Sequence, residues 1–225
     1  DGPVLARWCS GSERHDRCTL ALLDLGSFDL LPEGELSRPR LGGVLRDDLH
    51  IRPSPDGTVF GCWQGHSSPS GVFVLLRNGN RLTSSYQHDS VGWVVPNQTG
   101  THVATGSGLL PIGSLTTTGQ ARRTAPALPA HGSPLYLTIS GVEYFRSQRT
   151  SGPGPTIHAA DGTPLLTLPP LPEMVIADSD TSGDLTIDKR YHLYPTPGVL
   201  VTIGGSNDKV HARKIELLRK LLNDE

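Results

Sequence analysis

The sequence predicts an all-β fold, and three observations indicate it. Short runs of β-branched and aromatic residues alternate with turn-forming residues along most of the chain. Glycine (26) and proline (19) make up a fifth of the 225 residues without a collagen-like period, so turns are dense and elements short. Similar segments recur at intervals of about 45 residues, the length of a four-stranded propeller blade. We therefore expect a β-propeller of about five four-stranded blades over residues 1–215, followed by a short C-terminal helix at 216–225.

The segment from Leu49 to Tyr86 has the clearest strand pattern. Four runs fill it: Leu49–Arg52, Thr58–Trp63, Gly71–Arg77 and Arg81–Tyr86. The first two runs flank Ser54-Pro55-Asp56-Gly57, where proline presets φ and glycine supplies the positive φ of a tight turn. The last two flank Asn78-Gly79, the strongest short-range hairpin signal. This segment predicts four consecutive antiparallel strands, with Gly57 at positive φ.

Comparable strand-like runs occur on both sides of this segment. They are Val4–Cys9 with Thr19–Leu25, Val91–Val95 with Thr101–Thr105 and Leu109–Ile112, Leu135–Ile139 with Val142–Arg146, Thr156–Ala159 with Leu165–Leu168, and Tyr191–Tyr194 with Val199–Ile203. The openings at Val4, Leu49, Val91, Leu135 and Tyr191 are 45, 42, 44 and 56 residues apart. The longest interval leaves room for an insertion over Leu171–Asp188.

The connections between blades and the closure of the ring lead to two further expectations. The proline-rich segment Arg122–Pro134 has no periodicity, so we expect it to connect two blades on the surface. A propeller ring closes when strands from both chain ends share one sheet. The candidates are Val4–Cys9 and, at the other end, Val199–Ile203 with Lys209–Ile215. A β-sandwich of similar strand count is the alternative fold, because periodicity alone does not separate the two.

One short helix is expected near the end of the chain. Ile215, Leu218 and Leu222 repeat at helical spacing, and Glu216 and Lys220 form a favourable i,i+4 pair. A helix of this length is not stable alone in water, so we expect it to dock on the sheets or on a partner.

The units Leu49–Tyr86 and Val91–Leu115 resemble divergent blades of the bacterial WD40-like β-propellers. The resemblance rests on the turn Ser54-Pro55-Asp56-Gly57 and on a weaker version of it at Pro96–Gly100. The C-terminal stretch resembles the closing blade of such proteins over Asp188–Pro195, Val199–Ile203 and Ser206–His211. The resemblance implies a rigid ring that presents many loops for contacts with other proteins.

Charge and hydropathy exclude some classes of partner. The formal net charge of −2 gives no electrostatic basis for binding nucleic acid or an anionic membrane surface. The longest apolar runs, Gly71–Leu76 and Val199–Ile203, are too short to span a bilayer, so no membrane insertion is expected. The chain opens at Asp1 without a signal-peptide pattern, and we expect a processed or excised piece of unknown compartment.

The most motif-like acidic segment contains Asp178, Asp180 and Asp184. It matches the first half of an EF-hand-type calcium loop, with oxygen ligands at the first, third and fifth positions and glycine at the sixth. The twelfth position, where a bidentate acid belongs, is Lys189. An acidic surface loop between strands is therefore the preferred interpretation, and calcium binding is the alternative.

The histidines do not form a local metal site. There are nine, and none pair at i,i+2 or i,i+4 spacing. His50, His102 and His192 lie on or near expected inner strands, where blades bring equivalent positions toward a central channel. Ordinary hydrogen-bonded histidines of the core or edge are the preferred alternative. No Gly-x-Ser-x-Gly motif occurs, and we assign no catalytic, cofactor-binding or metal-binding residue.

Three cysteines, Cys9, Cys18 and Cys62, leave two possibilities open. Cys9 and Cys18 can pair across a hairpin in an oxidising compartment, or all three are free thiols that act as small buried apolar groups. The odd number argues against a scaffold built on disulfides.

These observations favour a non-catalytic binding or scaffolding module that contacts a protein partner, as part of a larger protein or assembly. This expectation follows from the predicted fold, because a rigid ring presents many loops on its two faces. The alternative is a hydrolase or lyase with its site at the central mouth of the propeller.

Overall fold

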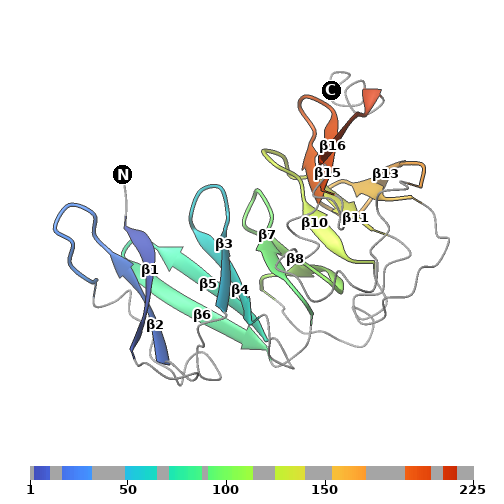
Figure 1. Ribbon diagram of the computed structural model, residues 1–225. Coiled ribbons are helices and arrows are strands. Elements are labelled where there is room, and N and C mark those ends of the chain that lie inside the picture. Colours follow the sequence, from blue (N-terminus) through green and yellow to red (C-terminus); the bar gives the residue numbers. More distant parts are fainter. Residues whose placement is uncertain are drawn as a thin grey trace.

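The protein is all-β, and the strands of its described residues form five antiparallel sheets (Figure 1). The computed structural model describes residues 3–10, 17–31, 49–64, 71–87, 91–113, 125–139, 154–170, 191–203 and 210–216. Within these ranges, no helix has the length and apolar character needed to cross a membrane. The expected C-terminal helix at 216–225 lies outside the described residues, apart from its first residue.

Every sheet is an up-and-down meander whose strands follow one another in chain order. The first sheet contains β1 (Val4–Ser10) and β2 (Arg17–Leu23). The second contains β3 (Leu49–Pro53), β4 (Val59–Gln64), β5 (Val72–Asn78) and β6 (Arg81–Gln87). The third contains β7 (Val94–Pro96), β8 (His102–Thr105) and β9 (Gly108–Pro111). The fourth contains β10 (Ala127–Pro129), β11 (Tyr136–Thr138), β12 (Thr156–His158) and β13 (Pro164–Thr167). The fifth contains β14 (Tyr191–Tyr194), β15 (Val199–Ile203) and β16 (Val210–Lys214).

The prediction of four consecutive antiparallel strands between Leu49 and Tyr86 is confirmed by the second sheet. Its strands pair without interruption, and Asn78 lies opposite Arg81 across the last turn. Gly57 has a φ of 65° and Gly79 a φ of 58°, so both turn glycines adopt the left-handed conformation for which glycine is suited. The residues of these two turns therefore determine where the strands of this sheet begin and end.

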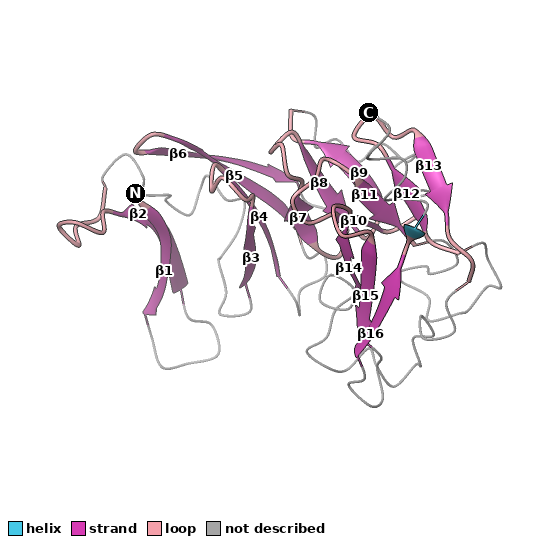
Figure 2. Ribbon diagram, turned by 90° about the horizontal axis from the view of Figure 1, so that it is seen from above, coloured by secondary structure: helices cyan, strands magenta, loops and turns pink. Residues whose placement is uncertain are grey.

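The sheets follow one another in space in the order of the chain, from the N-terminal end to the C-terminal end (Figures 1 and 2). The first strand of the third, fourth and fifth sheets packs against the sheet before it. Strand β7 contacts β3 and β4, β10 contacts β7 and β8, and β14 contacts β10. The fold is a series of adjacent sheets, and none of the described sheets closes on itself.

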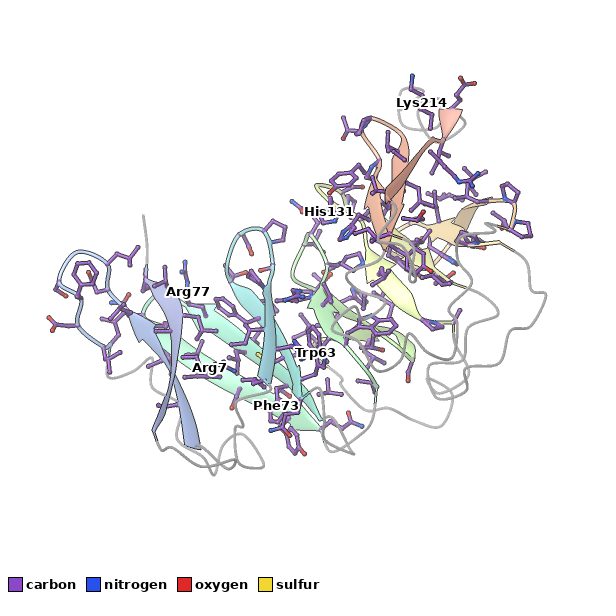
Figure 3. All side chains as sticks on the ribbon, in the orientation of Figure 1. Arg7, Trp63, Phe73, Arg77, His131 and Lys214 are labelled. Atoms are coloured by element: carbon purple, nitrogen blue, oxygen red, sulfur yellow. The ribbon has the colours of Figure 1, made fainter. Side chains whose placement is uncertain are left out.

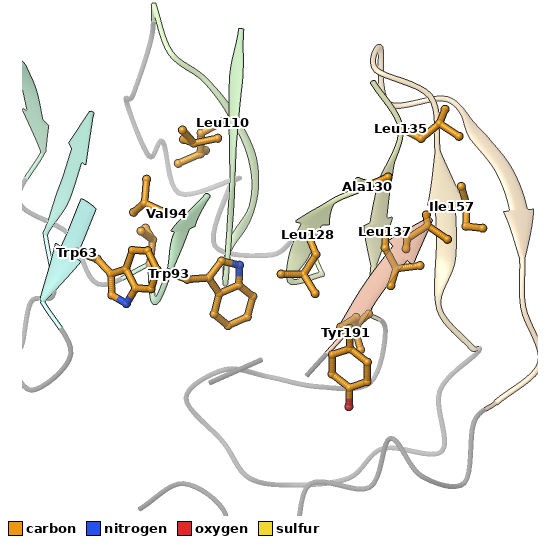
Figure 4. Packing of buried hydrophobic residues seen from close by; sticks show 14 of the residues in the cluster. Trp63, Trp93, Val94, Leu110, Leu128, Ala130, Leu135, Leu137, Ile157 and Tyr191 are labelled. Atoms are coloured by element: carbon orange, nitrogen blue, oxygen red, sulfur yellow. The ribbon is translucent and has the colours of Figure 1, made fainter. Parts of the chain in front are cut away.

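A continuous apolar core joins the second sheet to the fifth. It runs from Trp63 through Trp93 and Leu128 to Tyr191, all of them buried (Figure 4). The indole Nε1 of Trp93 donates a buried hydrogen bond of 2.9 Å to the carbonyl oxygen of Ala127, which links the third sheet to the fourth. The polar edge of this large side chain is thus satisfied inside the core.

A second apolar cluster lies between the first and second sheets. Leu20 and Leu22 of β2 are fully buried there, together with Phe60, Phe73 and Leu75 of the second sheet. Successive side chains of a strand point to opposite faces, so β4 and β5 supply both clusters. The two central strands of the second sheet, β4 and β5, are therefore buried on both faces over most of their length.

Gly61 allows the second and third sheets to approach closely. A Cβ atom at this position would overlap the carbonyl oxygen of Val94 in β7. Backbone atoms cannot move away as a flexible side chain can, so only glycine fits at this point of β4.

The proline-rich segment was predicted to be a surface connection, and this prediction is wrong. Residues Ala127–Pro129 form β10, and Ala127 and Leu128 are buried in the core. Proline is tolerated because β10 is the edge strand of its sheet, where one side of the backbone needs no ladder partner. The fourth sheet therefore opens at Ala127 and not at Leu135, and the regular spacing of the strand openings is lost there.

The expectation that Val4–Cys9 shares a sheet with Val199–Ile203 is also wrong. Among the described residues β1 pairs only with β2, and β15 pairs with β14 and β16; β1 and β16 lie at opposite ends of the series (Figure 1). Contacts to the second sheet hold the first sheet in place. The guanidinium of Arg7 donates to the carbonyl oxygen of Leu49 (3.0 Å), and that of Arg77 donates to the carbonyl oxygen of Pro3 (2.7 Å).

We predict that Gly61→Ala lowers the free energy of unfolding by about 1–3 kcal/mol, because overpacking forces the backbones of β4 and β7 apart. Urea unfolding monitored by tryptophan fluorescence measures the change. Gly113→Ala is the matched control, because a Cβ atom there has open space, and its effect should stay within about 0.5 kcal/mol. Equal effects of the two substitutions would contradict the close approach.

Candidate binding face

Four similar turns lie along one margin of the protein. Each joins the first two strands of a sheet and contains a glycine at positive φ: Gly57 (65°), Gly100 (62°), Gly132 (66°) and Gly198 (65°). Figure 1 shows the turns at the upper margin of the second to fifth sheets. We call them the first to fourth margin turns.

The first three margin turns share a backbone hydrogen bond. The amide of the first turn residue donates to the carbonyl oxygen five residues later, from Ser54 to Val59, from Asn97 to His102 and from Ala130 to Leu135. The distances are 2.7, 2.9 and 2.9 Å. Different sequences thus close turns of the same length at equivalent places in three sheets, with the positive-φ glycine at the fourth turn position in the first two turns and at the third position in the third.

The first margin turn is held by its own side chains. Asp56 accepts hydrogen bonds from the Ser54 hydroxyl (2.6 Å) and from the hydroxyl and amide of Thr58 (2.8 and 3.1 Å). These bonds lower the pKa of Asp56 below its ordinary value, with the Ser54 bond as the largest cause. Ser54 Oγ in turn accepts from the amide of Val59 (3.0 Å). The predicted Ser-Pro-Asp-Gly turn is therefore a fixed structure with an ionised carboxylate.

The second margin turn uses an asparagine for the same purpose. The side-chain oxygen of Asn97 accepts from the amides of Thr101 (3.0 Å) and His102 (3.1 Å), and its amide group donates to Thr99 Oγ1 (3.0 Å). Asn97 is 2% exposed, which places this network beneath the turn. Both turns thus satisfy their backbone with a polar first residue.

The third margin turn meets strand β14 in a cluster of three rings. His131 Nε2 lies 3.1 Å from His192 Nδ1, and the His131 ring stacks on Tyr194 with centroids 4.6 Å apart and planes 14° apart. The amide of His131 donates to the carbonyl oxygen of Leu193 (2.8 Å). Figure 3 places His131 between the fourth and fifth sheets. The cluster therefore lies where these two sheets join.

The two imidazoles face each other through their nitrogen atoms. The ring centroids are 5.3 Å apart, whereas His131 Nε2 and His192 Nδ1 are 3.1 Å apart. The difference is about the sum of the two ring radii, so these two nitrogen atoms lie between the ring centres. One nitrogen donates a proton and the other accepts it, which requires at least one neutral ring. Burial, followed by the charge of His192, lowers the pKa of His131 below its ordinary value of 6.5. This geometry fits a hydrogen bond, in which the two nitrogen atoms point at each other. In a metal site the lone pairs of both nitrogens would instead point at the metal ion.

The other histidines considered from the sequence have separate partners. His50 stacks on Trp63 with centroids 5.0 Å apart, and His102 Nδ1 lies 3.0 Å from Thr101 Oγ1. The structure thus places His192 with His131, and not with His50 and His102. No signal in the sequence indicated this pair, because its members are 61 residues apart and belong to different sheets.

The residues that were candidates for calcium binding, Asp178, Asp180 and Asp184, lie outside the described residues. In the part of the chain that the structure describes, no group of three or more His, Cys, Asp or Glu side chains is arranged to hold a metal ion. The margin turns instead present hydrogen-bonding groups and aromatic rings, which suit contacts with another macromolecule.

Comparison with known proteins gives no assignment. No family model matches the chain, and no curated protein matches it in sequence.

We predict that the favourable coupling between His131 and His192 depends on pH. The pKa of folded His131 is lowered, so the unfolded chain takes up a proton at a pH where the folded one does not. Stability is therefore lost as the pH falls from about 6.5 toward the folded pKa, and it levels off below that value.

A double-mutant cycle with His131→Asn and His192→Asn measures the coupling. Near pH 8 it should be favourable by about 0.5–1 kcal/mol, as for a part-exposed hydrogen bond. At a pH low enough to protonate His131 it should vanish or become unfavourable, because burial and the charge of His192 both oppose a charge on His131. A coupling that is the same at both pH values would contradict the shared proton.

Proposed function

We propose that this chain is a non-catalytic binding module that contacts a protein partner through the four margin turns. The observation that supports it is the row of similar turns along one margin, of which the first two are fixed by internal hydrogen bonds. Rigid loops bind with a small loss of conformational entropy, because they are already ordered before the partner arrives. Exposed side chains at the turns, Asp56, Thr99, His131 and Thr196, provide mixed hydrogen-bonding groups for a polar interface.

We further propose that the sheets are blades of a WD40-like β-propeller. Three features support this: the sheets are meanders in chain order, consecutive sheets pack on each other, and a turn of the same length with the same closing hydrogen bond joins the first two strands of three of them. A β-sandwich is the alternative, in which the sheets combine into two facing layers. The first and fifth sheets are the two ends of the series, so a complete ring needs them to meet within the chain or through a second copy.

Solution scattering tests the propeller proposal. Light scattering gives the mass of the particle, and small-angle X-ray scattering gives its shape. We expect either a monomer with the profile of a flat ring or a dimer in which two copies complete one ring. An elongated monomer would contradict the proposal.

Substitutions at the margin turns test the binding role. We expect Thr196→Arg in the fourth margin turn to weaken capture of the partner from an extract of the source cells at least tenfold, because an added cation disturbs a complementary surface. Thr83→Arg is the matched control, because Thr83 is exposed on β6, the outer strand of the second sheet. Mass spectrometry of the captured proteins provides the readout. Identical captured sets for all three proteins would rule out the margin turns as the interface.

A further inference from the structure

The first sheet places two cysteines opposite each other. Strands β1 and β2 pair in an unbroken register from Val4 with Leu23 to Ser10 with Arg17, and within it Cys9 is the direct partner of Cys18. We propose that Cys9 and Cys18 form a cross-strand disulfide when a disulfide oxidant such as oxidised glutathione is present. This inference is independent of the binding role.

The backbone geometry of an antiparallel pair suits this bond. Directly opposite residues have Cα atoms about 4.5–5.5 Å apart, within the range of about 4.4–6.8 Å found in disulfides. Their Cβ atoms lie about 4.5–5.5 Å apart, against about 3.5–4.5 Å in a disulfide. The bond therefore needs only a small adjustment of the two strands.

The register that brings the cysteines together is fixed by the core. In the same register Leu5 lies opposite Leu22, and Arg7 opposite Leu20. Leu20 and Leu22 are fully buried against the second sheet. A slip by one residue would move these leucines to the solvent face, so burial of the leucines also holds Cys9 opposite Cys18.

The third cysteine is a poor competitor for the bond. Cys62 is a free thiol in β4 and only 1% exposed. Burial raises the pKa of its thiol far above the ordinary range, which leaves almost no thiolate. Disulfide exchange requires a thiolate as the attacking group, so Cys62 stays reduced.

The reaction with oxidised glutathione is balanced in two steps. The thiolate of one cysteine attacks a glutathione sulfur, forms a mixed disulfide and releases one glutathione thiolate. The second cysteine thiolate attacks the protein sulfur of that mixed disulfide and releases the second glutathione. The two cysteines lose two electrons and two protons, and one oxidised glutathione becomes two reduced molecules.

The bond would stabilise the part of the fold with the fewest strand partners. The first sheet has only two strands, and a two-stranded hairpin is marginal in water without packing against other elements. A disulfide between adjacent strands restricts the unfolded hairpin and so favours the folded one. Oxidation should therefore raise the melting temperature by several degrees and slow amide exchange in β1 and β2.

Mass spectrometry of the whole chain tests the proposal. The reduced protein is incubated with oxidised glutathione, denatured and treated with N-ethylmaleimide. We expect one maleimide adduct, on Cys62, and a Cys9–Cys18 cross-link in peptides mapped without reduction. Three maleimide adducts, glutathione retained on both cysteines, or a bridge to Cys62 would overturn the proposal.

Serine variants separate the bond from general effects of oxidation. Cys62→Ser should keep the cross-link and the rise in melting temperature. Cys9→Ser and Cys18→Ser should each lose both, while their melting temperatures match that of the reduced protein to within a few degrees. A rise that persists in Cys9→Ser would show that the stabilisation has another origin and would count against the assignment.

Discussion

Burial of the central strands of the second sheet on both faces is the constraint on which the rest of the fold depends. One face takes up the leucines of β2, and the other receives the third sheet at the distance that Gly61 permits. Without the first contact the two-stranded N-terminal sheet would have no apolar surface to cover it. Without the contact between the second and third sheets, the apolar core that continues to Tyr191 would end at Trp63. A sheet whose central strands are buried on two sides thus acts as the common wall of two cores.

Those parts of the fold that depend on neighbouring residues were predictable. The turn residues before Thr58 and after Arg77 place β3 to β6, because proline fixes φ and glycine permits the positive φ that the turns require. Strand β10 was missed because two prolines next to Leu128 indicate a connection, and only its position at a sheet edge makes them acceptable. The hairpin of β1 with β2 was predicted and is confirmed, but the expectation that β1 also joins the C-terminal strands was wrong, because strand pattern does not specify which sheet a hairpin packs against.

The candidate site also has a part that could be predicted from the sequence and a part that could not. The first and second margin turns follow from their own sequences, since Ser54 and Asn97 satisfy the turn backbone within a few residues. The contact between His131 and His192 depends on how the fourth and fifth sheets pack together, and the spacing of the histidines in the sequence does not predict it. The pairing of Cys9 with Cys18 was predictable only in part. The sequence predicted a hairpin there, but the exact register of its strands decides whether the two residues lie opposite each other.

The second margin turn separates the residues that fix its backbone from a residue that faces solvent. In the second turn Asn97 is buried and bonds the backbone, Gly100 supplies the required φ, and Thr99 is exposed. Substitution of the exposed residues can alter the chemistry of the margin while the loop keeps its form. The same scaffold can therefore acquire a new recognition surface by a few exchanges, without any cost to the packing of the sheets beneath it.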